Sequence, residues 1–184
     1  IRTHVISDQG KMAFQEYFVA HRCTPVLRHV VYEGIDSASP AERLSKALDD
    51  IGRSGTDVVI GPSNPFLSIA PILDIPDMQA FLRHAARRVV AVSPIIGGQA
   101  LKGPAGKIMS ELGLEVSATG WTHWMNEHYP GLVDVWVWDE TDQQVADDLR
   151  AEGMDIRTTS TVMSDPERAA AFGDWLFRVC ESDH

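Results

Sequence analysis

Short apolar segments that alternate with helical segments most restrict the fold of this chain. The apolar segments have the length of buried strands and lie at residues 56–61, 88–95, 132–138 and 154–159. Helix-starting prolines, helix-ending glycines and helical patterning predict helices at residues 75–88, 103–113, 117–129, 141–153 and 165–180. Strands that alternate with helices of this length form βαβ units. The pattern therefore predicts a mostly parallel sheet covered on both faces.

The first 34 residues have a different pattern, which is typical of an antiparallel hairpin. Residues 2–7 and 12–21 are strand-like, and Gly10 lies in the turn between them. Residues 25–34 predict a third strand, and a helix follows from residue 39 to Gly52. We expect a single α/β domain over residues 1–184, with a hairpin region (1–34) before the βα units (56–184). The fold class is a Rossmann-like open sheet preceded by an antiparallel hairpin.

Composition and cysteine use restrict the class of protein. Hydrophobic residues make up 44% of the 184 residues, which is enough to bury a core without disulfides or metals. The only cysteines, Cys23 and Cys180, have no metal-ligand spacing, and the sequence has no membrane-spanning apolar run or signal segment. We therefore expect a cytoplasmic protein. The sequence begins at Ile1, without methionine and directly in strand-like residues, which we interpret as a cut in a longer chain.

Charge is distributed unevenly along the chain. The net charge of −10 is unfavourable for binding a nucleic-acid polymer, but residues 78–110 contain no Asp or Glu. This window carries five cations: Arg83, Arg87, Arg88, Lys102 and Lys107. A basic window in an acidic chain favours a small anionic ligand. Alternatively, the arginines close the helix at residues 75–88 and the lysines are solvated.

Two loops hold the candidate binding residues, because ligands of open α/β sheets bind where the strands end. In the first loop, residues 61–68, prolines flank Ser63 and Asn64, and no residue is charged. The fixed backbone would present Gly61, Ser63, Asn64 and Ser68 as a neutral cradle for phosphate or base edges. The alternative is a tight turn in which Ser63 and Asn64 satisfy their own backbone.

The second loop follows the strand at residues 88–95 and contains the pair Gly97-Gly98, which would let a ligand approach the backbone closely. Lys102 and Gly103 come next, and Lys107 lies one turn inside the following helix. A lysine at the positive end of a helix is unfavourable unless an anion binds there too, so phosphate is the expected ligand. The alternative is a surface loop with solvated lysines.

Other candidates carry less weight. Four tryptophans are interpreted as core or dimer-interface residues in preference to ligand-stacking residues: Trp121, Trp124, Trp136 and Trp138. Three acids that follow a strand could bind a metal or start the next helix: Asp139, Glu140 and Asp142. Three hairpin residues could contact a flat substrate or simply pack: Gln15, Tyr17 and Phe18. The residues alone indicate an α/β domain that binds a phosphorylated small molecule.

Three segments carry a resemblance to a known family: residues 59–78 (VIGPSNPFLSIAPILDIPDM), 89–113 (VVAVSPIIGGQALKGPAGKIMSELG) and 2–19 (RTHVISDQGKMAFQEYFV). The chain resembles the C-terminal half of the 2-phospho-L-lactate transferase family of coenzyme F420 biosynthesis. The intact GPSNP and KGPAGK segments favour this family over the related gluconeogenesis-factor group, whose members would make the chain a non-catalytic regulatory module that binds a nucleotide or nucleotide sugar.

The resemblance implies a chemistry. A guanosine-diphosphate-activated three-carbon acid, of the phospholactate, phosphoenolpyruvate or phosphoglycerate type, is transferred to the deazaflavin Fo, and GMP is released with the aid of Mg²⁺. It implies nucleotide and phosphate contacts for Gly61, Ser63, Asn64, Ser68, Gly97, Gly98, Lys102, Gly103 and Lys107. The family's magnesium ligands lie in a glycine-rich N-terminal part, so the resemblance assigns no metal ligand here. We expect a homodimer without transfer activity of its own, which binds neither nucleic acid nor membrane.

Overall fold

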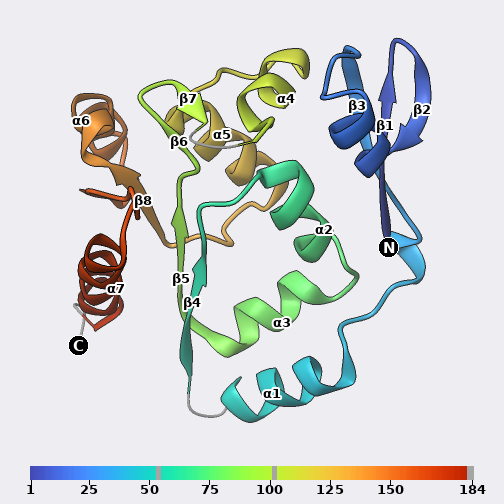
Figure 1. Ribbon diagram of the computed structural model, residues 1–184. Coiled ribbons are helices and arrows are strands. Elements are labelled where there is room, and N and C mark those ends of the chain that lie inside the picture. The colour runs from blue at the N-terminus through green and yellow to red at the C-terminus, as the bar shows by residue number, and fades with distance from the viewer. Residues whose placement is uncertain (53–54, 101–102, 182–184) are drawn as a thin grey trace.

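The computed structural model describes residues 1–52, 55–100 and 103–181 (Figure 1). Its main sheet is parallel and has the order β4-β5-β8-β9. The four strands are β4 (Thr56–Ile60), β5 (Ala86–Val92), β8 (Val135–Asp139) and β9 (Ile156–Thr159). All four were predicted, with small shifts at their ends. The predicted fold class, an open parallel α/β sheet after an antiparallel hairpin, is therefore confirmed.

Alternating residues of the central strands belong to two hydrophobic clusters. In β5, Val89 and Ala91 join a large cluster, whereas Val90 and Val92 join a smaller one with Phe172. The large cluster includes residues of α2 (Ala70–Leu73), α4 (Ala105–Glu111), α5 (Ala118–His128) and α6 (Gln143–Ala151). The smaller cluster includes α7 (Pro166–Glu181). A strand with period-two side chains that are buried on both sides accounts for the uninterrupted apolar sequence of residues 89–92.

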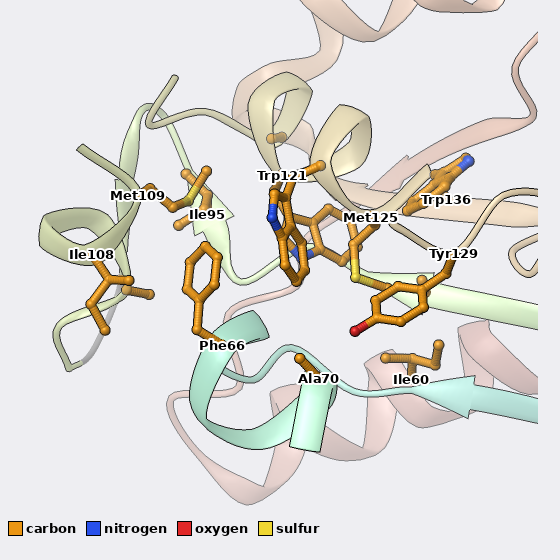
Figure 2. Packing of buried hydrophobic residues seen from close by; sticks show 14 of the residues in the cluster. Ile60, Phe66, Ala70, Ile95, Ile108, Met109, Trp121, Met125, Tyr129 and Trp136 are labelled. Carbon is orange, nitrogen blue, oxygen red and sulfur yellow. The ribbon is translucent and has the colours of Figure 1, made fainter. Parts of the chain in front are cut away.

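The tryptophans lie in the large cluster. Trp121 packs edge-on against Trp136 with ring centroids 5.3 Å apart, and Trp124 lies 4.8 Å from the ring of Phe66. Figure 2 shows Phe66, which lies in η3 (Pro65–Ile69), pointing into the cluster between Ile95 and Trp121. Trp138 is fully buried, and its indole N–H donates to Thr122. The interpretation of these residues as core residues is confirmed.

A second sheet holds the first three strands in the antiparallel order β2-β1-β3. They are β1 (Arg2–Ser7), β2 (Gly10–Ala13) and β3 (Leu27–Glu33), and Gly10 has the expected positive φ of 100°. The prediction of a strand over residues 12–21 was wrong beyond Ala13, because η1 (Glu16–Ala20) is helical. Phe14, Tyr17 and Phe18 stand at helical spacing, which places the fully buried Tyr17 against the core.

The remaining helices differ from the prediction mainly in their ends. α1 spans Glu42–Gly52, and α3 spans Met78–Ala85, shorter than the predicted helix at residues 75–88. Arg87 and Arg88 therefore lie in β5, and the interpretation that they close a helix was wrong. Arg87 contacts Asp57 of β4 at 2.7 Å, and Arg88 donates to the backbone oxygen of Val179 in α7. None of the helices in the described residues is both long and apolar enough to span a bilayer.

Candidate functional site

Two cavities meet at the carboxyl edge of the parallel sheet. The sheet-edge cavity, of about 690 Å³, is lined by residues that follow three strands: Pro62–Asn64 after β4, Ser93, Pro94 and Ile96 after β5, and Thr161–Ser164 after β9. The hairpin cavity, of about 650 Å³, lies between the N-terminal sheet and the segment from Asn64 to Ser68. Asn64 and Gly103 line both cavities, so the two form adjoining parts of one site.

Asn64 is held by the helix that it starts. Its side-chain oxygen accepts from the backbone N–H groups of Phe66 (3.0 Å) and Leu67 (3.1 Å), and Pro65 occupies the first helical position of η3 (Pro65–Ile69). The alternative interpretation, that Asn64 satisfies its own local backbone, is therefore correct for the oxygen. Its amide nitrogen is buried and has no hydrogen-bond partner among the described residues. This unused N–H₂ donor therefore belongs to a residue at the boundary of the two cavities.

The other predicted residues of the first loop divide between the two cavities. Ser63 lines the sheet-edge cavity, and Ser68 lines the hairpin cavity. Gly61 lines neither; its carbonyl accepts from the backbone N–H of Ser63 at 2.8 Å, which closes the turn before η3. The structure thus brings three of the four predicted residues of this loop to the site. The prediction of a loop as far as Ser68 was wrong, because the helix begins at Pro65.

The glycine pair of the second loop has a conformational role. β6 (Ile95–Ile96) and β7 (Gln99–Ala100) form a hairpin, and the two residues between them, Gly97 and Gly98, have φ of 55° and 75°. The backbone N–H of Gly97 donates to the carboxylate of Asp142 at 3.1 Å. Neither glycine lines the sheet-edge cavity or the hairpin cavity, so the structure does not bring them to this site.

Three further residues of this region were predicted to bind phosphate. Gly103, with φ of 72°, lines both cavities just before α4, whereas Lys102 lies outside the described residues. Lys107 faces the N-terminal sheet instead. Its ammonium donates to Tyr17 Oη (3.1 Å), to the backbone oxygen of Pro25 (3.1 Å) and to Glu111.

Those three bonds use all the donors that a lysine has. Burial alone would lower the pKa of Lys107, but the hydrogen bonds to Glu111 and Tyr17 raise it above the usual value. Lys107 lines neither cavity. Lys107 therefore links α4 to the hairpin region, whereas a phosphate contact was predicted for it.

The third wall of the sheet-edge cavity, Thr161–Ser164, was not predicted from the sequence. Asp139, at the end of β8, supports this wall: Oδ1 accepts from Thr141, and Oδ2 accepts from the backbone N–H (2.9 Å) and hydroxyl (3.0 Å) of Thr161. Burial would raise the pKa of Asp139, but these hydrogen bonds hold it below the usual value. The available signal was the Thr/Ser-rich run at residues 158–161, which begins in the strand predicted at residues 154–159 and continues past its end.

The hairpin cavity is aromatic on one side. The rings of Phe14 and Phe18 stack with centroids 5.6 Å apart, and both line the cavity with Gln15. Phe18 is 43% exposed, so its face is available to a ligand. Tyr17 is fully buried, and its hydroxyl contacts Lys107 and Cys23, so of the three hairpin candidates it is the one that packs.

The acids near the site are occupied by protein groups. Both carboxylate oxygens of Asp139 accept from Thr141 and Thr161, and Asp142 accepts from Gly97. Within the described residues there is no cluster of three or more His, Cys, Asp and Glu side chains that could hold a metal. These residues therefore do not fit a magnesium site.

An open α/β sheet with loops that form a two-part cavity at its carboxyl edge is the arrangement in which α/β proteins commonly bind small ligands. The sequence matches the model of the family described as "2-phospho-L-lactate transferase CofD" over residues 1–173. The chain belongs to this family.

Individual relatives agree with the family match. The chain is 38% identical over 167 residues to the 2-phospho-L-lactate transferase of Methanococcoides burtonii, a match that covers 91% of this chain and 51% of the relative. It is 39% identical over 176 residues to the phosphoenolpyruvate transferase of Thermobifida fusca, with 93% and 50% covered. The chain thus spans about half the length of these curated relatives.

Solved structures support the fold. A crystal structure of a UPF0052 family member from Bacillus halodurans superposes with a TM-score of 0.54 at 16% identity, covering 89% of this chain and 53% of that chain. At this identity the similarity concerns the fold alone.

Proposed function

We propose that this chain forms part of an enzyme that transfers a phospholactate-type or phosphoenolpyruvate-type group from a guanosine-diphosphate-activated donor to the deazaflavin Fo. Membership in the family and the names of the relatives supply the reaction class. The observation that carries the proposal is the junction of two cavities at the unpaired amide of Asn64. A transfer between two bound molecules needs two adjoining spaces with a donor group where the reacting phosphate lies.

In this proposal the nucleotide portion of the donor occupies the sheet-edge cavity. Its position at the carboxyl ends of β4, β5 and β9 is the usual place for a ligand of an open α/β sheet. Ser63 and Ser164 supply hydroxyls in a lining without charged residues among those described, so contacts to the phosphates there are neutral hydrogen bonds. Lys102 remains the predicted source of positive charge.

The flat ring system of Fo occupies the hairpin cavity, against the stacked pair Phe14 and Phe18. The hydroxyl of its side chain then attacks the phosphorus of the three-carbon acid's phosphate. A new P–O bond forms, the bond to the GMP oxygen breaks, and the hydroxyl proton is released. Asn64 holds a phosphate oxygen at the junction while the bonds exchange. The described residues of this chain do not fit a Mg²⁺ ion.

Titration calorimetry with GMP and with Fo tests the proposal. We expect both to bind the same molecule at once, because they occupy different cavities. Phe18→Ala should weaken Fo binding by about 1–3 kcal/mol, the usual contribution of one aromatic stacking contact, and leave GMP binding unchanged. The matched control is Val19→Ala, since Val19 is exposed (66%) next to Phe18 but lines neither cavity. Mutual competition between GMP and Fo would contradict the two-cavity arrangement.

A further inference from the structure

Two side chains of α4 hold a segment of the hairpin region, which lies beside this helix (Figure 1). Nζ of Lys107 donates to the backbone oxygen of Pro25 at 3.1 Å and to Oε1 of Glu111. Oε2 of Glu111 accepts from the backbone N–H of Leu27 at 2.9 Å. The two side chains are one helical turn apart and only 34% and 18% exposed. This ion pair therefore fixes residues 25–27 from a helix that lies 82 and 84 positions later in the chain.

The segment that the ion pair holds has an irregular backbone. Arg22 and Cys23 have positive φ, of 49° and 56°, which residues other than glycine rarely adopt. The pairing of β1 with β3 then shifts between Ile6 and Ser7, where β3 begins at Leu27. A backbone of this kind persists only where the surrounding structure holds it in place. The ion pair of α4 supplies that support.

Lys107 also contacts the helix that carries the aromatic wall of the hairpin cavity. Its ammonium donates to Tyr17 Oη at 3.1 Å and lies 5.7 Å from the centroid of that ring. Tyr17 is fully buried in η1, and its backbone oxygen accepts from the N–H of Cys23 at 2.9 Å. The cavity-lining Phe18 is the next residue, and the ring centroid of Phe14 lies 6.4 Å from that of Tyr17. The positions of both phenylalanine rings therefore depend on Tyr17.

The start of α4 forms another wall of the same cavity. Gly103 and Pro104 line it together with Phe14 and Phe18, and Lys107 follows Pro104 by three residues. One short helix thus provides one wall and holds the other. A gap of about 0.5–1 Å between packed surfaces already loses about a quarter to a half of their dispersion attraction. The binding of a flat ring between these walls is therefore sensitive to the spacing that the helix sets.

We propose that Lys107 is a positioning residue for the acceptor, because it sets the width of the hairpin cavity for a flat ring. This inference rests on the proposed function, which places the ring of Fo there. Lys107 lines neither cavity, so it acts through Tyr17, which carries the aromatic wall, and through Pro25, which anchors the irregular segment. The described lining of the sheet-edge cavity includes no residue of η1 or of the hairpin region, so nucleotide binding is independent of this contact.

The test compares a variant that removes the bonds of Lys107 with one that keeps them. Lys107→Met combined with Glu111→Gln neutralises both partners, so no unpaired charge is left behind, and the new amide oxygen can still accept from Leu27. Lys107→Arg keeps a cation that can reach Glu111. Phe172→Leu is the control for general loss of stability, because Phe172 is buried (5%) in the smaller cluster, away from the hairpin region.

The first readout is the labelling rate of the Cys23 thiol, measured without any ligand in a Cys180→Ser background. Cys23 is 8% exposed and lies in the segment that the ion pair holds. We expect the double variant to label about tenfold faster than the Phe172→Leu control, because the segment opens locally. Lys107→Arg should label at about the rate of the unmodified chain. Equal rates in the double variant and the control would show that Lys107 does not hold this segment, and would overturn the inference.

The second readout is the affinity for Fo and for GMP by titration calorimetry. Fo binding should weaken about tenfold or more in the double variant, within the usual contribution of a stacking contact, and Lys107→Arg should restore it. GMP binding should change by less than about twofold. Unchanged Fo affinity, or equal losses of Fo and GMP affinity, would overturn the positioning role. Failure of the unmodified chain to bind Fo would instead overturn the proposed function, so the two failures are distinguishable.

Discussion

The two loops that follow β4 and β5 have similar compositions but use their polar groups differently. In the loop after β4, Asn64 caps a helix with its oxygen and leaves its buried amide nitrogen unpaired at the junction of two cavities. In the loop after β5, Gly97 and Gly98 form a hairpin turn, and the N–H of Gly97 donates to Asp142. Loops rich in glycine, proline and small polar residues therefore indicate a binding site only where a polar group has no hydrogen-bond partner within the protein.

The largest expected effect tests the unpaired amide directly. Asn64→Asp keeps an oxygen that accepts from Phe66 and Leu67, so the helix cap is retained, and any loss in the free energy of unfolding comes from the second carboxylate oxygen at the buried position of Nδ2. It replaces the Nδ2 donor with an acceptor, and GMP or GDP affinity should fall by about 1.5–3 kcal/mol, roughly tenfold to 150-fold. Calorimetry and thermal unfolding measure the two effects separately.

Asn64→Ala is the companion variant, because it removes the oxygen as well as the donor. It should lose about 0.5–2 kcal/mol of stability in addition to affinity. Nucleotide binding by Asn64→Asp at the affinity of the unmodified chain would remove Asn64 from the site, and the loops after β4 and β5 would then both be structural.

The next prediction concerns the wall that Asp139 supports. The folded-state pKa of Asp139 lies below its usual value, so the charged carboxylate adds stability above the unfolded pKa of about 3.9, and this stability is lost as pH falls through the folded pKa. Asp139→Asn should therefore destabilise the chain by about 1–3 kcal/mol at pH 7, and the difference should shrink below about pH 4. Urea unfolding at several pH values measures this.

Glu140→Gln is the matched control, since Glu140 is the exposed neighbour of Asp139. We expect its effect to stay within about 0.5 kcal/mol. An equal loss in Asp139→Asn from pH 7 to pH 3 would show that the carboxylate charge does not hold the Thr161 segment.

Sequence patterns predicted the central strands correctly but failed for part of the N-terminal region. The strands with the residues VVAV and VWVW were found because burial on both faces leaves a continuous apolar run. The strand expected at residues 12–21 was wrong beyond Ala13. Aromatic residues three and four positions apart are compatible with a helix or with a strand. The burial of Tyr17 in the core agrees with the helix.

Part of the site could not be predicted, because it depends on contacts between residues that lie far apart in the sequence. Lys107 was expected at a phosphate, but it bonds to Tyr17, which lies 90 positions earlier in the chain. The wall at Thr161 was missed because it depends on Asp139, 22 positions earlier. The loop after β4 was located from its prolines and small polar residues, but the Asn64-Pro65 step, which places a cap and the first helical residue next to each other, was not recognised as the start of a helix. Local signals located the loop, and tertiary contacts decided which side chains remain available.

The smallest expected effect concerns the glycine turn after β5. Gly98 has φ of 75°, and a Cβ there would lie 3.5 Å from the backbone oxygen of Val116, which is ordinary contact. The cost of Gly98→Ala therefore comes from the left-handed backbone and should be about 1 kcal/mol, with GMP affinity unchanged within about twofold. Gly98→Asn should lose less, because Asn tolerates this conformation.

Gly173→Ala provides the opposite control for Gly98→Ala. Gly173 lies inside α7 without a positive φ, and a methyl group added there would meet nothing within 4 Å, so the substitution should stabilise the chain by about 0.4–1 kcal/mol. Thermal unfolding of the two variants should thus move the midpoint in opposite directions. A Gly98→Ala variant that keeps its stability but loses GMP binding would mean that a ligand approaches this backbone after all. The contrast between the loops after β4 and β5 would then disappear, because both would contact the nucleotide.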